Sequence, residues 1–177
     1  MIYIDFDDTL METYEPLFGD YVRDNENIKF VSNKEIVKGK NWNKVLSSSE
    51  EINEGIKIIK LLDPEKICIL TKIHSLENEG VAKIKFLRKM GVCCNIILVP
   101  YEFDKVEMVQ AKGNVLIDDN IYNLEKWEED GGIGIFFSKD CSKIDGFGRV
   151  NKKFKQIDSL NYLLDTHLKV KKKVILE

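Results

Sequence analysis

Two aspartates near the start of the chain have the residue type and spacing to act together on one substrate. Asp5 and Asp7 directly follow the apolar run 1–4, which predicts a short, buried strand. Side chains two residues apart on a strand point the same way, so both carboxylates can face one pocket at the edge of a sheet. Carboxylates placed together in this way can take part in catalysis. An acidic turn that only caps the strand would have the same spacing.

The elements that must position these carboxylates are further strands and helices in alternation. Apolar runs predict strands at 66–70, 95–99, 114–117 and 133–137, and helical periodicity predicts helices at 52–62, 77–90, 104–111, 121–129 and 158–168. This order predicts an α/β fold, a Rossmann-like doubly wound parallel sheet of about five strands with helices on both faces. Ligands of such sheets bind beyond the carboxyl ends of the strands.

Residues 13–48 interrupt the alternation and predict a small helical cap insertion in a core domain formed by residues 1–12 and 49–177. Helical spacing covers 14–22, and Asn33 can cap a second short helix that Gly39 ends. Ser49 is expected to start the helix that follows the insertion. The aromatic residues of the insertion serve either as a small core or as contacts for a substrate; they include Phe18, Tyr21 and Trp42.

Polar residues lie at or just after the predicted strand ends, and their types follow a definite order along the chain. They are Asp5 and Asp7, then Thr71, then Lys105, then Asp118 and Asp119. This order, with D-x-D-x-T-L at residues 5–10, resembles the four motifs of the haloacid dehalogenase-like (HAD) phosphatases. The resemblance covers residues 1 to about 137, with the insertion as its variable part.

The resemblance implies a Mg²⁺-dependent phosphoryl transfer through an aspartyl-phosphate. Asp5 is then the nucleophile and Asp7 the general acid, which later takes a proton from water. Asp5, the backbone carbonyl of Asp7 and Asp118 are the expected metal ligands, and Asp119 stands beside the metal to orient a water or the lysine. Thr71 and backbone N–H groups near Phe6 are expected to bind phosphoryl oxygens.

Three lysines could bind the phosphate: Lys72, Lys105 and Lys112. Lys105 is favoured because it lies in the first turn of a predicted helix, next to the edge of the sheet where ligands bind. Lys112 is seven residues later, roughly 10 Å further along a helix. Lys72 adjoins Thr71 and stays an alternative.

Composition limits the surroundings in which the protein works. The net charge is −3 with acids and bases mixed, which disfavours a polynucleotide partner. The four cysteines (Cys68, Cys93, Cys94 and Cys141) predict buried free thiols rather than a metal site or disulfides, and reduced thiols suit a cytoplasmic protein. The first predicted strand starts at residue 1, so no signal peptide is expected, and no apolar run is long enough to span a membrane.

These patterns predict an enzyme, a HAD-like phosphatase acting on a small phosphate ester. The layout looks most like the 5′-nucleotidase (deoxyribonucleotidase) branch, which implies a nucleoside monophosphate as substrate. A phosphatase acting on a phosphoprotein or a nucleic-acid end is the alternative, supported only by the basic segment 169–173. A non-catalytic binding module is disfavoured, because folding alone does not require so many polar groups at one edge.

Overall fold

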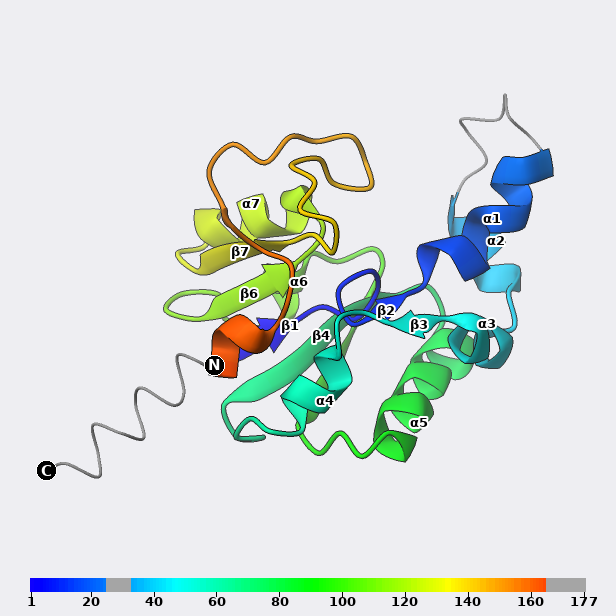
Figure 1. The fold of residues 1–177 in the computed structure, drawn as a ribbon, viewed down its shortest axis with the longest axis horizontal. Helices are drawn as coiled ribbons and strands as arrows, with labels where there is room; N and C mark the ends of the chain where they lie inside the picture. Colours follow the sequence, from blue (N-terminus) through cyan, green and yellow to red (C-terminus); the bar gives the residue numbers. More distant parts are fainter. Residues whose placement is uncertain (25–32, 165–177) are drawn as a thin grey trace, which may run out of the picture.

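The computed structural model describes residues 1–24 and 33–164 and has a six-stranded parallel sheet at its centre (Figure 1). The strand order is β5-β4-β1-β6-β7-β8. The strands are β1 (Ile2–Ile4), β4 (Ile67–Ile73), β5 (Asn95–Pro100), β6 (Val115–Asp118), β7 (Ile133–Phe137) and β8 (Lys155–Ile157). The predicted α/β fold with a doubly wound parallel sheet is therefore confirmed.

The register of the central strands brings the first and fourth predicted strands together. Ile4 of β1 pairs with Ile117 of β6 and with Ile69 of β4. The next residues along β1 and β6 are Asp5 and Asp118, so these two aspartates leave the sheet side by side. Their proximity follows from the pairing of the apolar residues that precede them.

Helices cover both faces of this sheet and enclose two hydrophobic clusters (Figure 1). The helices α4 (Gly55–Ile59) and α5 (Val81–Lys89) contribute to one cluster, and α6 (Lys105–Met108) and α7 (Ile121–Glu129) to the other. Strand side chains alternate between these clusters: Ile4 and Ile117 belong to the first, whereas Tyr3 and Leu116 belong to the second. The ring of Tyr3 meets Trp127 of α7 edge-on at 5.3 Å.

The described part of the segment 13–48 contains three helices, α1 (Tyr14–Asp24), α2 (Asn33–Gly39) and α3 (Trp42–Ser48). The helices predicted at 14–22 and from Asn33 to Gly39 are confirmed. The third helix, α3, was not predicted; the side chain of Asn41 caps it by accepting hydrogen bonds from two backbone N–H groups. On either side of the segment, β2 (Met11–Glu12) and β3 (Glu50–Glu51) pair antiparallel.

The expected role of Ser49 as a helix start is wrong. Ser49 ends α3, and its Oγ donates to the carbonyl oxygen of Val45 at 2.9 Å. The next helix, α4, begins only at Gly55, after Asn53 and Glu54 turn the chain with positive φ angles of 46° and 57°. Pairing of β3 with β2 takes the residues that were expected to form the first turn of the helix.

Other boundaries also differ from the prediction. The sixth strand, β8, has three residues, too few to show an apolar pattern, and residues 161–164 are the described part of the helix expected at 158–168. The helix expected at 77–90 opens with a π-helical turn, η1 (Leu76–Gly80), before α5. The π turn inserts an extra residue and shifts the helix face, so that Val81 is exposed although it was expected to face inward.

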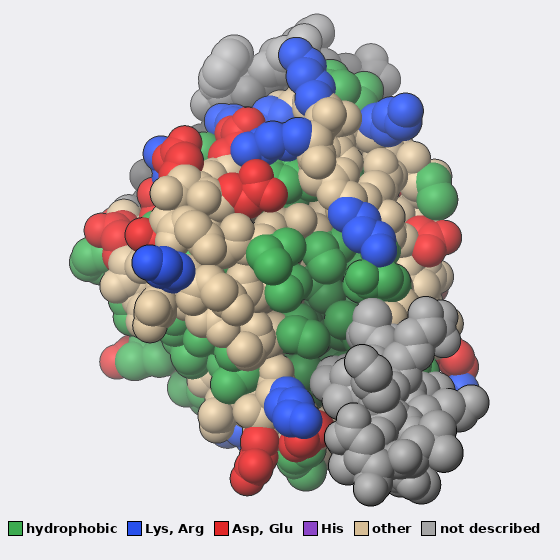
Figure 2. Space-filling view, turned by 90° about the vertical axis from the view of Figure 1, so that its left-hand side faces the viewer, with side chains coloured by type: hydrophobic (Ala, Val, Ile, Leu, Met, Phe, Trp, Pro, Cys, Tyr) green, Lys and Arg blue, Asp and Glu red, His purple; other side chains and the backbone are tan. Residues whose placement is uncertain are grey.

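The surface and the thiols complete the description. On the face in Figure 2, charges of both signs surround a central group of hydrophobic side chains. All four cysteines are free, as predicted, but only Cys68 and Cys94 are buried. The prediction of buried thiols is wrong for Cys93 and Cys141, which are exposed. Within residues 1–24 and 33–164, no helix has both the length and the apolar character needed to cross a membrane.

Candidate active site

Three carboxylates meet at the carboxyl ends of β1 and β6. One oxygen from each of Asp5, Asp118 and Asp119 can be chosen so that all three atoms lie within 4.8 Å of one another. Asp5 and Asp118 are buried and Asp119 is half-buried. Oxygen ligands in such a cluster fit a hard divalent cation such as Mg²⁺. Asp7, whose backbone carbonyl is the expected ligand, contributes no side-chain oxygen to this cluster.

Lys105 bridges two of the three carboxylates. Its Nζ donates to Asp5 Oδ1 and to Asp118 Oδ2, at 2.6 Å in each case, and its side chain is buried. Burial alone would lower the pKa of this ammonium group, but the charges of Asp118 and Asp5 outweigh it and raise the pKa. The competing candidates lie elsewhere: Lys72 pairs with Asp104 at 3.5 Å, and Lys112 is exposed.

The acid cluster carries more negative charge than Lys105 balances. Burial raises the pKa of Asp5 to about 7, against the lowering effect of the Lys105 charge, and the charges of Asp118 and Asp7 add to the rise. Burial and the charges of Asp118 and Asp5 also raise the pKa of Asp119. A cation would relieve this repulsion, which is a second reason why the cluster fits a metal.

Asp118 is held in place by the helix that follows it. One of its oxygens accepts from the backbone N–H of Asn120 at 2.9 Å, and both accept from the side-chain amide of Asn123, at 3.2 and 3.1 Å. The sequence analysis missed Asn123. The available signal was its place in the first turn of α7, where a side chain can reach back to the end of β6.

Asp7 has different partners, which come from Thr13, from β4 and from α5. Its Oδ1 accepts from the hydroxyl of Thr13 at 2.9 Å, and its Oδ2 accepts from Lys83 at 2.6 Å and from the hydroxyl of Thr71 at 3.3 Å. Thr71 is buried and lies within β4, which runs on to Ile73, rather than at the strand end as predicted. Its hydroxyl thus contacts the aspartate that was expected to act as the acid.

Lys83 is the second functional candidate that the sequence analysis missed. Its side chain is 0% exposed, and it also donates to Glu79 at 2.7 Å. Burial alone would lower its pKa, but Asp7 and Glu79 outweigh burial and raise it. The spacing of Glu79 and Lys83, four residues apart on a helix, was the available signal, yet the same spacing is common on solvated surfaces.

The turn between β1 and β2 carries the backbone N–H groups that are expected to bind phosphoryl oxygens. Among the described residues, no recorded hydrogen bond is donated by the backbone N–H of Phe6 or Asp7. Asp8 has a φ of 50°, and its Oδ1 accepts from the N–H groups of Thr13 and Tyr14. Asp8 therefore caps the turn locally, and burial raises its pKa to about 6.

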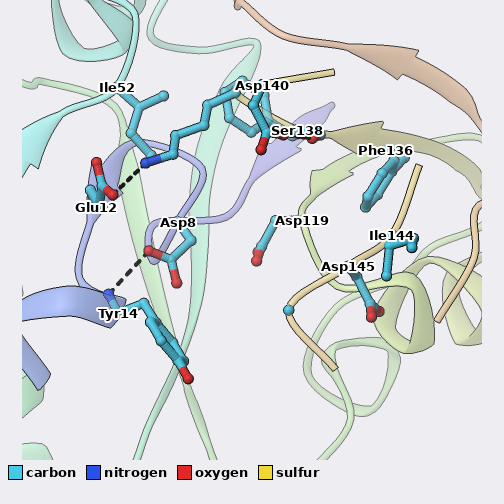
Figure 3. Close-up of a pocket in the computed structure, with 13 residues that line it drawn as sticks. Asp8, Glu12, Tyr14, Ile52, Asp119, Phe136, Ser138, Asp140, Ile144 and Asp145 are labelled. Carbon is cyan, nitrogen blue, oxygen red and sulfur yellow. Dashed lines mark hydrogen bonds and ion pairs between the residues drawn. The ribbon is translucent and has the colours of Figure 1, made fainter. Parts of the chain in front are cut away.

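A cavity of about 460 Å³ borders the acid cluster through Asp119 (Figure 3). Its wall combines apolar with charged side chains and includes Tyr14, Ile52 and Phe136. Of the two roles left open for the aromatic residues of the insertion, Trp42 takes the core role, because it is 1% exposed and its indole N–H donates to the carbonyl oxygen of Val37. Phe18 packs against Tyr14, and the side chain of Tyr21 and the segment 169–173 lie outside the described residues.

Comparison with known proteins identifies the fold. No family model and no curated protein matches the sequence. Solved structures do match: the HAD-hydrolase YfnB from Bacillus subtilis, described as bound to magnesium, aligns with 93% of this chain and 96% of its own at 13% identity and a TM-score of 0.59. A HAD-superfamily hydrolase from Ehrlichia chaffeensis covers 93% and 94% at 12% identity and a TM-score of 0.55. A subfamily IA hydrolase from Geobacter sulfurreducens covers 93% and 97% at 9% identity and a TM-score of 0.59.

Proposed function

Because the chain has the fold of the HAD-superfamily hydrolases, we propose that it is a magnesium-dependent phosphatase acting on small phosphate esters. The observation that carries the proposal is the acid cluster bridged by Lys105, with a second aspartate, Asp7, beside it on the same turn. HAD enzymes that lack this second acid tend to catalyse reactions other than phosphate hydrolysis. The presence of Asp7 therefore favours a phosphatase over a dehalogenase.

Asp5, Asp118 and Asp119 are the side chains that would hold the Mg²⁺, with the carbonyl oxygen of Asp7 as a further ligand. A bound Mg²⁺ supplies positive charge that screens the nucleophile from the phosphate. Lys105 adds a fixed cation at the same place, and the backbone N–H groups of Phe6 and Asp7 can donate to phosphoryl oxygens.

The reaction proceeds in two displacements at phosphorus. A carboxylate oxygen of Asp5 attacks the phosphorus, and the bond to the leaving oxygen breaks with its electron pair while Asp7 supplies a proton to that oxygen. A water oxygen then attacks the aspartyl-phosphate. The bond from phosphorus to Asp5 breaks, its electrons return to the carboxylate, and the water proton passes to Asp7, so inorganic phosphate is released and both aspartates are restored.

The cavity beside Asp119 is the proposed site of the leaving group. Its volume of about 460 Å³ suits a small molecule, which favours a small substrate over a protein or nucleic-acid end. A nucleoside monophosphate is the substrate that the sequence resemblance suggests. Tyr14 on the cavity wall, which is 51% exposed, is the ring available to contact a base, in place of the buried Trp42.

The test measures Mg²⁺-dependent hydrolysis of 4-nitrophenyl phosphate, followed by a screen of nucleotides, sugar phosphates and phosphopeptides. Asp5→Asn is expected to lower turnover by at least about 1,000-fold, because it removes the nucleophile, and to leave the circular dichroism spectrum unchanged.

The control is Asp130→Asn, an exposed aspartate at the end of α7, which should keep full activity. Retained turnover in Asp5→Asn would refute the nucleophile assignment. If the wild-type protein releases halide from 2-haloacids but hydrolyses no phosphate ester, the phosphatase proposal is wrong. If nucleoside monophosphates rank no higher than the other esters, the nucleotidase assignment alone is wrong.

A further inference from the structure

Lys83 is a fully enclosed cation that the proposed reaction does not use directly. Its ammonium group donates to Asp7 Oδ2 at 2.6 Å, to Glu79 at 2.7 Å, and to the hydroxyl of Thr71 and the carbonyl oxygen of Lys72 at 3.1 Å each. An ammonium group has three protons, so these four acceptors saturate it. With 0% exposure and no donor to spare, Lys83 cannot bind a substrate.

Asp7, by contrast, is open to the site. The side chain of Asp7 is 30% exposed. Its Oδ2 is engaged by Lys83 and Thr71, whereas its Oδ1 accepts a single hydrogen bond, from Thr13. A carboxylate oxygen can accept a second bond, so Oδ1 is the atom able to take a proton from a water. Lys83 and the two threonines together fix the direction in which this atom points.

Glu79 and two aromatic rings hold Lys83 where it is. Glu79 is 2% exposed and accepts from the backbone N–H of His74 at 2.8 Å, so this second acceptor is itself anchored. The ring of Trp42, from α3, lies 4.8 Å from the ammonium group, and the ring of Phe6 lies 5.3 Å from it. Cations over aromatic faces are attracted by them, most strongly when water is excluded.

We propose that Lys83 is a positioning residue that orients the Asp7 carboxyl group for the attack of water on the aspartyl-phosphate. This inference rests on the proposed function and assigns Lys83 to its second displacement. In that step the water oxygen bonds to phosphorus, the phosphorus–Asp5 bond breaks, and the water proton goes to Asp7. The hydrogen bonds from Thr13, Thr71 and Lys83 hold the Asp7 side chain in one orientation for this transfer.

The test compares Lys83→Met with wild type in the presence of MgCl₂ and 4-nitrophenyl phosphate, by stopped flow and in the steady state. Formation of the aspartyl-phosphate releases 4-nitrophenol, a good leaving group that needs little help from an acid. Lys83→Met is therefore expected to release a burst approaching one equivalent of 4-nitrophenol, followed by steady-state turnover about 100-fold below wild type, the scale of a general-base contribution. Lys85→Met, an exposed lysine on the same helix, is the matched control and should match wild type.

Two more variants separate positioning from simple loss of structure. Glu79→Gln/Lys83→Met removes both buried charges, so it retains the fold should Lys83→Met alone be unstable, and it is expected to show the same burst. Asp7→Asn/Lys83→Met should turn over no more slowly than Asp7→Asn, because Lys83 acts through Asp7.

The outcomes distinguish the two proposals. A wild-type protein that hydrolyses no phosphate ester overturns the proposed function, and this inference with it. If wild type is active, the inference alone is overturned by unchanged turnover in Lys83→Met, by slow turnover without a burst, or by a further loss in the Asp7→Asn background.

Discussion

At the scale of single residues, the site separates two aspartates that are only two positions apart. Asp5 is held by Lys105 from α6 within a buried acid cluster, whereas Asp7 is held by Lys83 from α5 and stays partly exposed. The two lysines come from helices that pack in different hydrophobic clusters of the sheet. Different surroundings allow the same residue type to take different parts in one reaction.

The raised pKa of Asp5 predicts a pH dependence of stability in the metal-free protein. The pKa of Asp5 is about 7 in the folded state and 3.8 in the reference state, so the folded protein binds more protons between these values. Stability is then fully present below about pH 4 and falls as the pH rises through 7, by an amount on the order of a few kcal/mol. Urea unfolding with EDTA at pH 5 and pH 7.5 should give the lower free energy of unfolding at pH 7.5.

Asp5→Asn removes the titrating group and should flatten this decline, which makes it the control. Asp8, whose pKa is raised to about 6, and Asp119, whose pKa is also raised, act in the same direction and leave a residual slope. A free energy of unfolding that increases from pH 5 to pH 7.5 in the metal-free wild-type protein would contradict the assignment.

The sequence predicted the residues whose position depends on a strand and missed those that depend on packing between helices. Asp5 and Asp118 were found because each follows an apolar run, and pairing of those runs forces the two side chains together. Lys83 could not be found in this way. Its burial depends on the π-helical turn before α5 and on Trp42 of α3, and neither has a local pattern that specifies it.

At the scale of elements, α7 positions Asp118 and depends on a close approach to the strand that follows. Gly132 lies in the turn between α7 and β7, where a Cβ atom would stand 2.3 Å from the ring of Trp127 and 2.9 Å from the carbonyl oxygen of Ala111. A rigid indole ring and a backbone oxygen cannot move aside easily. Only glycine fits this turn without displacing the helix that carries Asn123.

Gly132→Ala is therefore expected to lower the free energy of unfolding by about 1–3 kcal/mol, as for an overpacked core. Urea unfolding of the purified variant measures the loss. The comparison is Gly39→Ala at the end of α2, where a Cβ meets nothing within 4 Å and the change should stay within about 0.5 kcal/mol. Equal effects at the two glycines would show that the crowding around Trp127 is unimportant.

At the scale of the whole molecule, the core with its parallel sheet could be predicted from the sequence, whereas the insertion could be predicted only in part. The strand and helix alternation specified the parallel sheet, because buried strands leave continuous apolar runs. The short strand β8 and the pair β2–β3 escaped because two or three residues carry no periodicity. Metal binding would link β1 to β6, since the acid cluster takes ligands from the ends of both strands.

Mg²⁺ is expected to stabilise the folded molecule, because the intact acid cluster exists only when β1 and β6 are paired. A ligand at a hundredfold excess over its Kd adds about 2.7 kcal/mol, which raises Tm by roughly 5–10 °C for a chain of this size. Thermal unfolding with and without MgCl₂ measures the shift. Asp118→Asn should lose most of it, whereas the exposed Asp130→Asn should retain it; an unchanged shift in Asp118→Asn would move the metal elsewhere.

The antiparallel pair of β2 and β3 bears on how a chain of this kind can diversify. The pair holds residues 12 and 50 together, so the segment between them can be replaced by another of different length. Each doubling of the length of such a loop adds only about 0.6 kcal/mol to the entropic cost of closing it. A chimaera built at this junction would keep Asp5 and Asp118 but discard Trp42, the lid over Lys83. A replacement segment can therefore vary in length, but it must supply an aromatic ring that covers Lys83 as Trp42 does.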